Sequence, residues 1–199
     1  MKRSKMCAGL LLAGMIVCFA CGGKGAAYVS GPQANNAQTG SPATGELRFK
    51  APDGWTKEQP TSTMRVAQYK LPRAEGDPDE AQLVVYYFGA QQGGAVQANI
   101  DRWISQIHQP DGSDSKAKAK TETSTVNGLK VTSVDVAGMY TADMSPGVPG
   151  QRSDANYRLR AAVIETPKGN YFLKLVGPAK TMERWDQSVT DFVKSFEFK

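Results

Sequence analysis

The chain has 199 residues, of which 40% are apolar, 22% charged and 9% aromatic, a composition typical of a folded soluble protein and not of a disordered or fibrous one. The formal charge of +5 falls to +2 without the three basic residues among the first five, because 21 basic and 19 acidic residues then remain. Such a balance lacks the electrostatic footprint of DNA- or RNA-binding proteins, so we expect no nucleic-acid partner.

Residues 1–20 have the pattern of a bacterial signal peptide. Three basic residues precede residues 7–20, a run of 14 uncharged and mostly apolar residues. This run suits the apolar region of a signal peptide and is shorter than the roughly 20 residues of a membrane-spanning helix. It ends in Cys18-Phe19-Ala20-Cys21, which resembles a lipobox with Cys18 where the motif usually has leucine. The resemblance implies cleavage before Cys21 and lipidation of its thiol.

Two other interpretations of this segment stay open. An ordinary secretory signal cut after Ala27 would release a soluble secreted protein, and an uncleaved anchor would use the uncharged residues 6–23. All three cysteines lie at or before position 21, so residues 22–199 have no disulfide, thiol nucleophile or thiol ligand. We therefore expect Cys21 to be a lipid site and not a redox site.

Residues 21–45 are predicted to be the lipidated cysteine and a flexible tether. Residues 22–44 are rich in Gly, Ala, Ser, Asn and Pro and show no hydrophobic periodicity. A random coil of this length has an r.m.s. reach of about 25–30 Å. We expect residues 46–199 to form a single globular domain.

The first half of this domain is predicted to contain three strands and a helix. Alternating or continuous apolar residues predict strands at 47–49, 64–71 and 81–88. Residues 83–88 are all apolar, so this strand is expected to be covered on both faces. Apolar residues at helical spacing then predict a helix that ends before Pro110. Its stripe consists of Val96, Ile100, Trp103, Ile104 and Ile107.

The second half is predicted to contain two hairpins and a final helix. Strands 116–125 and 129–140 are joined by Asn127-Gly128, a pair that tolerates positive φ angles. Strands 157–166 and 171–176 are joined by a turn at 168–170. The final helix is expected to begin with Thr181 as N-cap. Its apolar stripe consists of Met182, Trp185, Val189, Phe192, Val193 and Phe196.

These elements predict an α+β domain, with a mostly antiparallel sheet of about seven strands and one helix on each face. The motif Pro52-x-Gly54-Trp55 after a short strand, and a terminal helix closing in residues 195–198, resemble the PsbP/Mog1-like α/β/α sandwich. Short runs, among them Tyr87-Phe88-Gly89, resemble an uncharacterised family of bacterial secreted lipoproteins. The resemblance implies a fold and an exported bacterial context, and it implies no activity.

Few residues are candidates for chemistry. The only histidine, His108, lacks the partners that a general base or a metal site needs, and at the end of a helix it would complement the dipole. Gly89–Gly94 matches no phosphate-binding motif. The acidic residues of loop 73–80 offer oxygen ligands for calcium, but a solvated hairpin loop is the simpler interpretation. We expect no catalytic residue, no metal and no cofactor.

Two surface features are candidates for binding. Lys116, Lys118 and Lys120 alternate, and on a strand they would protect an exposed edge or bind an anionic polymer. Residues 141–156 form the longest irregular connection, and long loops often carry function. The predicted partner surface on this loop consists of Met144, Pro146, Val148 and Arg152.

Together these features predict a non-enzymatic, lipid-anchored binding or assembly protein of the bacterial envelope. It would face the periplasm or the exterior, with the membrane and an envelope protein as partners. One alternative is a periplasmic module that binds a ligand or calcium through loops 73–80 and 141–156. Another is a carboxylate-based enzyme, which a carboxylate cluster in a deep pocket would support.

Overall fold

An antiparallel eight-stranded sheet organises the chain in the computed structural model, which describes residues 45–141 and 153–199. Seven strands follow the spatial order β2-β3-β4-β9-β8-β7-β5, and the eighth, β6, pairs with the first part of β7. The strands, in chain order, are β2 Thr56–Glu58, β3 Arg65–Leu71, β4 Ala81–Tyr87, β5 Ile107–His108, β6 Lys120–Val126, β7 Leu129–Thr141, β8 Ser153–Thr166 and β9 Gly169–Pro178.

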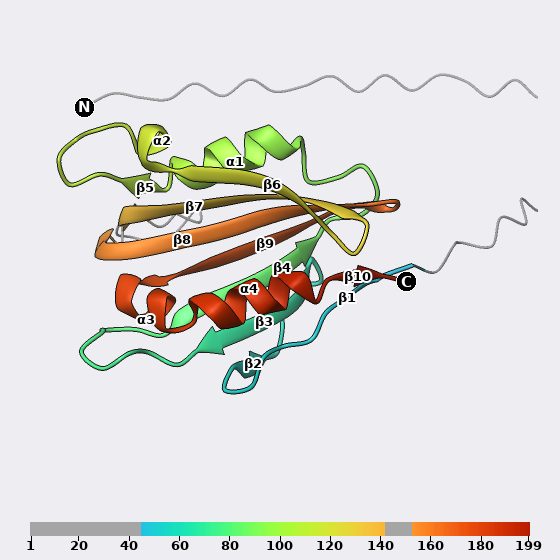
Figure 1. Cartoon of the computed structure of the whole chain (residues 1–199), viewed down its shortest axis with the longest axis horizontal. Coiled ribbons are helices and arrows are strands. Elements are labelled where there is room, and N and C mark those ends of the chain that lie inside the picture. Colours follow the sequence, from blue (N-terminus) through green and yellow to red (C-terminus); the bar gives the residue numbers. More distant parts are fainter. Residues whose placement is uncertain (1–44, 142–152) are drawn as a thin grey trace, which may run out of the picture. The chain divides into compact units, whose positions relative to one another are not determined.

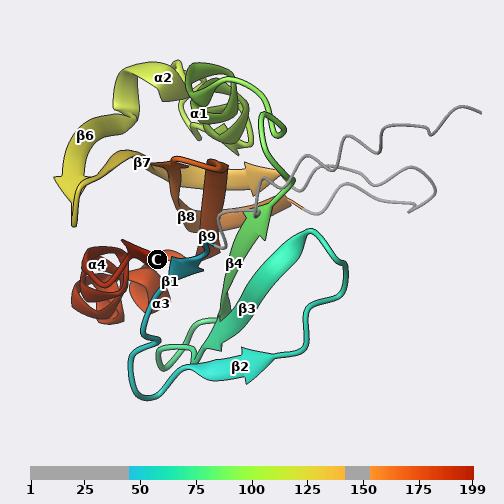
Figure 2. The same cartoon turned by 90° about the vertical axis from the view of Figure 1, so that its right-hand side faces the viewer.

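Helices lie on both faces of this sheet, as Figures 1 and 2 show. The helices are α1 Val96–Ile104, α2 Ser115–Lys118, α3 Ala179–Arg184 and α4 Asp186–Lys194. A separate two-stranded sheet pairs β1 Leu47–Arg48 with β10 Glu197–Phe198, so the start and the end of the domain lie side by side. The predicted α+β class, with an antiparallel sheet and helices on both faces, is confirmed.

The face under α3 and α4 carries the larger core. Phe192 of α4 lies at its centre, with ring centroids 5.2 Å from Phe49, Trp55 and Phe196. Strands β3, β4 and β9 contribute the buried side chains Tyr69, Leu71, Leu83, Val85, Leu173 and Leu175. Alternate residues of each strand therefore point to this face, as the period of two requires.

The opposite face carries a second core under α1. Helix α1 contacts β7 and β8, and its Ile100, Trp103 and Ile104 are buried, which confirms the predicted stripe at these positions. Phe172 of β9 lies below them, 6.5 Å from the Trp103 ring. Leu83, Val84 and Val85 are all buried, as predicted for this strand, although within the described residues the helix of this face lies over β7 and β8 and not over β4.

The β6–β7 hairpin turns at Asn127-Gly128, as predicted. Both residues have positive φ angles, 48° and 82°, which suit a two-residue turn. The Asn127 side chain donates hydrogen bonds to the main-chain oxygens of Lys194 and Phe196, at 3.1 and 2.9 Å. The turn therefore also satisfies carbonyl groups that the end of α4 leaves without helical partners.

Ionic contacts attach the start of α4 to the sheet. Arg158 of β8 donates paired hydrogen bonds to Asp135 of β7 and to Asp186 of α4, at 2.6–3.0 Å. Arg160 also donates to Asp186, at 3.0 Å. The hydrogen bond from Arg158 to Asp135 is the main cause of a raised pKa of this guanidinium, so Arg158 is charged at every ordinary pH.

Three predicted boundaries are wrong. The first helix ends at Ile104, and Ile107 belongs to β5. Residues 115–118 form α2 and not a strand, because Asp114 caps this turn by accepting a hydrogen bond from the main chain of Lys116. The second hairpin turns at Pro167-Lys168, one residue earlier than predicted.

The predicted final helix is interrupted at Trp185. This residue has φ −101° and ψ 5°, which ends α3 and starts α4. Its indole nitrogen donates to the main-chain oxygen of Pro72, at 2.8 Å. In the described part of the chain, no helix is long and apolar enough to cross a membrane.

Candidate functional site

One half of the α1 face has no helix over it within the described residues. Helix α1 covers β7 and β8, whereas β3 and β4 lie beyond it (Figure 2). The strand register places side chains of three strands together on this half, since Val84 of β4 pairs with Gln68 of β3 and with Lys174 of β9. A groove of about 220 Å³ lies over these residues, lined by Arg65, Gln82, Val84, Tyr86, Tyr140, Lys174 and Val176.

Two cations of the groove each lie over an aromatic ring. The Arg65 guanidinium is 5.7 Å from the centre of the Tyr86 ring, and the Lys174 ammonium is 5.3 Å from that of Tyr140. Lys174 also donates to the side chain of Gln106 at 2.5 Å and to the Tyr140 hydroxyl at 3.3 Å. The groove thus combines fixed positive charges with aromatic surface, a combination suited to a ligand that has both a negative and an apolar part.

A chain of polar contacts holds Arg65 in place along the edge of the sheet. Arg65 donates to Gln68 at 2.7 Å, and Gln68 donates to Glu58 at 2.8 Å. Lys70 forms ion pairs with Glu58 and with Glu80, at 3.3 and 3.6 Å. The hydrogen bond from Gln68, and then the contact with Lys70, lower the pKa of Glu58, so this carboxylate stays ionised while it positions its neighbours.

Next to the groove, three large apolar side chains are exposed. They are the apolar corner of the domain: Met64, Val66 and Phe88, with exposed fractions of 49%, 43% and 37%. The Phe88 ring is stacked on Tyr86, with centroids 6.0 Å apart and planes 5° apart. The main-chain oxygen of Met64 accepts a hydrogen bond from Tyr87, at 2.9 Å, which joins the start of β3 to the end of β4. The groove and the corner therefore share one aromatic stack.

His108 lies elsewhere, in β5, and not at the end of a helix as predicted. Its side chain is exposed on the wall of a cavity of about 410 Å³ between α1 and α2. In the same cavity Lys116 forms an ion pair with Asp101, at 3.2 Å. Within residues 45–141 and 153–199, no three His, Cys, Asp or Glu side chains are placed to hold a metal ion.

The acidic loop 73–80 is bound to other parts of the domain. Asp77 accepts hydrogen bonds from the main chain and the hydroxyl of Thr181, at 2.8 and 2.6 Å. Asp79 accepts one from the Tyr157 hydroxyl, at 2.8 Å. The prediction that Thr181 caps its helix is wrong, because Thr181 is a buried residue within α3 and its own main-chain amide donates to Asp77.

Other predicted features lie apart from the groove. Lys116 and Lys118 belong to α2, and only Lys120 is in a strand, so the three lysines do not alternate along one edge. The Gly89–Gly94 turn connects β4 to α1, as predicted, beside the β8–β9 turn. Cys21 and the predicted partner surface lie outside the described residues; that surface is Met144, Pro146, Val148 and Arg152.

The groove residues were missed because their pattern indicated something else. Tyr86 belongs to the continuous apolar run 83–88, which predicts cover on both faces. Arg65 and Lys174 look like ordinary solvent-facing residues of alternating strands. One local signal for the groove is present in the sequence. Val84, Tyr86 and Phe88 alternate, so two aromatic side chains follow Val84 on the same face at the end of β4.

Comparison with known proteins gives structural similarity only. No protein-family model and no curated protein matches the chain. Among solved structures, it is similar to a Pseudomonas aeruginosa protein of unknown function, with 14% identity, a TM-score of 0.43, and coverage of 71% of this chain and 94% of that one.

Two further solved structures are similar, each with 11% identity and a TM-score of 0.44. One is LpqN of Mycobacterium tuberculosis, described as involved in cell envelope biogenesis, with 81% of this chain and 87% of that one covered. The other is the cyanobacterial PsbP of Synechocystis, with 77% and 86% covered. PsbP is the fold family that the sequence resembles, and no function is transferred from any of these proteins.

Proposed function

We propose that this protein is an exported, lipid-anchored binding protein of the bacterial envelope, and that the groove beside Tyr86 holds its partner. The observation that carries the proposal is the groove itself, where two cations lie over aromatic rings on the half of the sheet that α1 does not cover. Antiparallel sheets can leave part of a face to solvent, so the open half alone indicates nothing; the charged and aromatic groups that converge on it make it a candidate recognition surface.

The envelope location is supported by the first 21 residues. Basic residues, 14 uncharged residues and Ala20-Cys21 have the order that export and lipidation require. A lipid on Cys21 would keep the domain at a bilayer through the tether that follows. Anchoring raises the local concentration of the groove near other envelope molecules, so a modest intrinsic affinity suffices.

Binding is favoured over catalysis by the chemistry of the groove. The Arg65 guanidinium is held in position by Gln68 and the Tyr86 ring, which suits recognition of an anionic group and not proton transfer. His108, the only histidine, lies in a different cavity. The alternative of a calcium site in loop 73–80 would use Asp77 and Asp79 as ligands. These carboxylates already accept hydrogen bonds from Thr181 and Tyr157, which disfavours that alternative.

The test is complementation of a strain that lacks the gene. The double variant Arg65→Gln/Tyr86→Leu should fail to complement while its unfolding free energy stays within about 1 kcal/mol of the wild type, since both positions are partly exposed. His108→Ala is the matched control and should complement fully. Full complementation by the groove variant together with failure of His108→Ala would contradict the proposal and indicate chemistry at the other cavity.

Two further variants test the rest of the proposal. Cys21→Ala should lose the lipid mass and complement only in part, because the domain would no longer be concentrated at the membrane. Unmodified Cys21 in the mature wild-type protein would contradict the anchor. Deletion of residues 142–152, which carry the partner surface predicted from the sequence, should reproduce the loss of function without unfolding the domain.

A further inference from the structure

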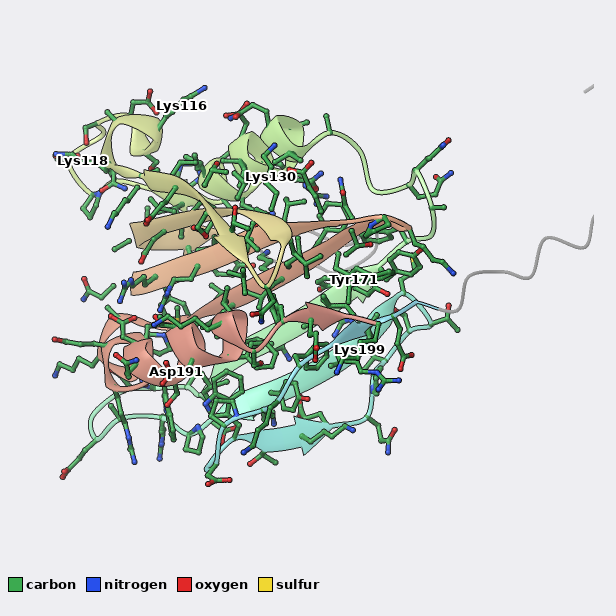
Figure 3. The ribbon with its side chains drawn as sticks, turned by 45° about the vertical axis from the view of Figure 1, so that its right-hand side comes forward. Lys116, Lys118, Lys130, Tyr171, Asp191 and Lys199 are labelled. Atoms are coloured by element: carbon green, nitrogen blue, oxygen red, sulfur yellow. The ribbon has the colours of Figure 1, made fainter. Side chains whose placement is uncertain are left out.

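The apolar corner lies at the end of the domain where the described chain begins. Figure 1 shows the start of β1, the start of β3, the end of β4 and the β8–β9 turn at this end, and Figure 2 looks directly onto it. In Figure 3, Tyr171 and Lys199 mark this end, whereas Lys116 and Lys118 lie at the opposite one. All three large apolar side chains that are exposed in the described part of the chain are therefore on the same end as Gly45.

Direct contacts connect the start of the domain to this corner. The main-chain N–H of Leu47 donates to the Tyr171 hydroxyl at 3.4 Å, and the Tyr171 ring is stacked on Tyr87 with centroids 4.5 Å apart. Tyr87 in turn donates its main-chain N–H to Met64 at 2.9 Å and its hydroxyl to the main-chain oxygen of Lys168 at 2.8 Å. Two tyrosines thus connect β1, the apolar corner and the β8–β9 turn.

We propose that this end of the domain rests on the bilayer that holds the lipid of Cys21. Met64, Val66 and Phe88 would enter the headgroup region, and Lys168 of the adjacent β8–β9 turn would contact anionic headgroups. The inference depends on the proposed lipid anchor and adds an orientation to it. The flexible tether that the sequence predicts would by itself fix no orientation.

The composition of the corner favours a lipid surface as its occupant. Peripheral membrane contacts combine a few apolar or aromatic side chains with basic residues, because the first enter the interface and the second attract anionic lipids. Three exposed side chains are few for a stable interface with a second copy of the chain. They suit a weak contact that becomes effective when a lipid keeps the domain at the bilayer.

A reporter thiol tests the orientation in the full chain. Cysteines occur only at positions 7, 18 and 21, so Val66→Cys and Phe88→Cys each place one new label at the corner. Lys118→Cys on α2, at the opposite end, is the matched control. The purified proteins are labelled with a fluorophore and reconstituted into vesicles of phosphatidylcholine and phosphatidylglycerol in equal amounts, with or without a quencher on the acyl chains. Labelled wild-type protein gives the background.

We expect the lipid-borne quencher to reduce emission at positions 66 and 88 about threefold more than at position 118, as for side chains inserted at the interface. Lys168→Gln should reduce this difference in anionic vesicles and leave it unchanged in pure phosphatidylcholine. Equal quenching at all three positions overturns the proposal. Protection of positions 66 and 88 from a water-soluble quencher without quenching by the lipid-borne one also overturns it, because a protein would then cover the corner.

The mass of the N-terminal peptide tests the anchor separately. A lipid mass on Cys21 with equal quenching at all positions refutes the bilayer contact and leaves the anchor in place. Unmodified Cys21 with quenching at position 66 on added vesicles refutes the anchor and supports the contact.

Discussion

The two faces of the sheet are covered to different extents. On one face, α3, α4 and the β1–β10 pair bury an aromatic core around Phe192. On the other, α1 covers β7 and β8, and the groove beside Tyr86 lies over β3, β4 and β9. The regions under helices stabilise the domain, whereas the half that no helix covers within the described residues is the proposed recognition surface. Substitutions on the two faces should therefore affect different properties.

The largest effect is expected at the centre of the covered face. Phe192→Ala should lower the free energy of unfolding by about 3–5 kcal/mol, because the removed ring leaves a cavity among four aromatic neighbours. Phe88→Ala on the apolar corner is the matched control and should cost less than about 1.5 kcal/mol, since that ring is partly exposed. Urea unfolding measures both, and equal costs would remove the distinction between the two regions.

The second test concerns the part of the other face that α1 covers. Trp103→Ala should cost about 3 kcal/mol, because the indole is buried between α1 and the sheet, near Phe172. Thermal or urea unfolding of the full chain measures the cost. A value below about 1 kcal/mol would mean that this helix contributes little and that the whole face is open.

A smaller effect is expected at the ionic contacts of α4. Asp186→Asn should lower the unfolding free energy by about 1–2 kcal/mol, because Arg158 and Arg160 lose a shared charged acceptor that is only partly shielded from water. Lys130→Gln, which removes an exposed pair with Glu165, should stay within about 0.5 kcal/mol. Identical losses would show that the cluster acts as an ordinary surface pair.

The smallest stability effect depends on pH. Burial on the covered face raises the pKa of Tyr69 above its ordinary value of 10.0. Above that value the unfolded chain releases this proton first, so the stability supplied by the neutral phenol is complete below pH 10 and is lost as pH rises through the raised pKa. Tyr69→Phe should make the alkaline loss of stability less steep in unfolding series above neutral pH. An unchanged slope would contradict the desolvation of Tyr69.

Sequence patterns correctly predicted the elements that neighbouring residues determine. The alternation in β3, the apolar run in β4, the stripe of α1 and the Asn127-Gly128 turn all depend on neighbours in sequence, and all are confirmed. Predictions failed where a distant residue decides the structure. The helix break at Trp185 accompanies a hydrogen bond to Pro72, and β5 exists because residues 107–108 pair with β7.

The groove could not be predicted for the same reason. Arg65, Tyr86 and Lys174 are far apart in sequence, and only the strand register brings them together. Whether an apolar strand face is covered depends on where α1 lies, and α1 lies over β7 and β8 instead of β4. The sequence contains the groups of the site without showing that they meet.

Photo-crosslinking tests the central claim, that the uncovered half of the sheet is the recognition surface, most directly. A photoreactive amino acid replaces Gln82, an exposed residue of the groove, or Ala117, an exposed residue of α2, in the full chain expressed in its native host. The account predicts a discrete adduct from position 82 and none from position 117, and Arg65→Gln should weaken the adduct at 82. An adduct at 117 with none at 82 would contradict the claim.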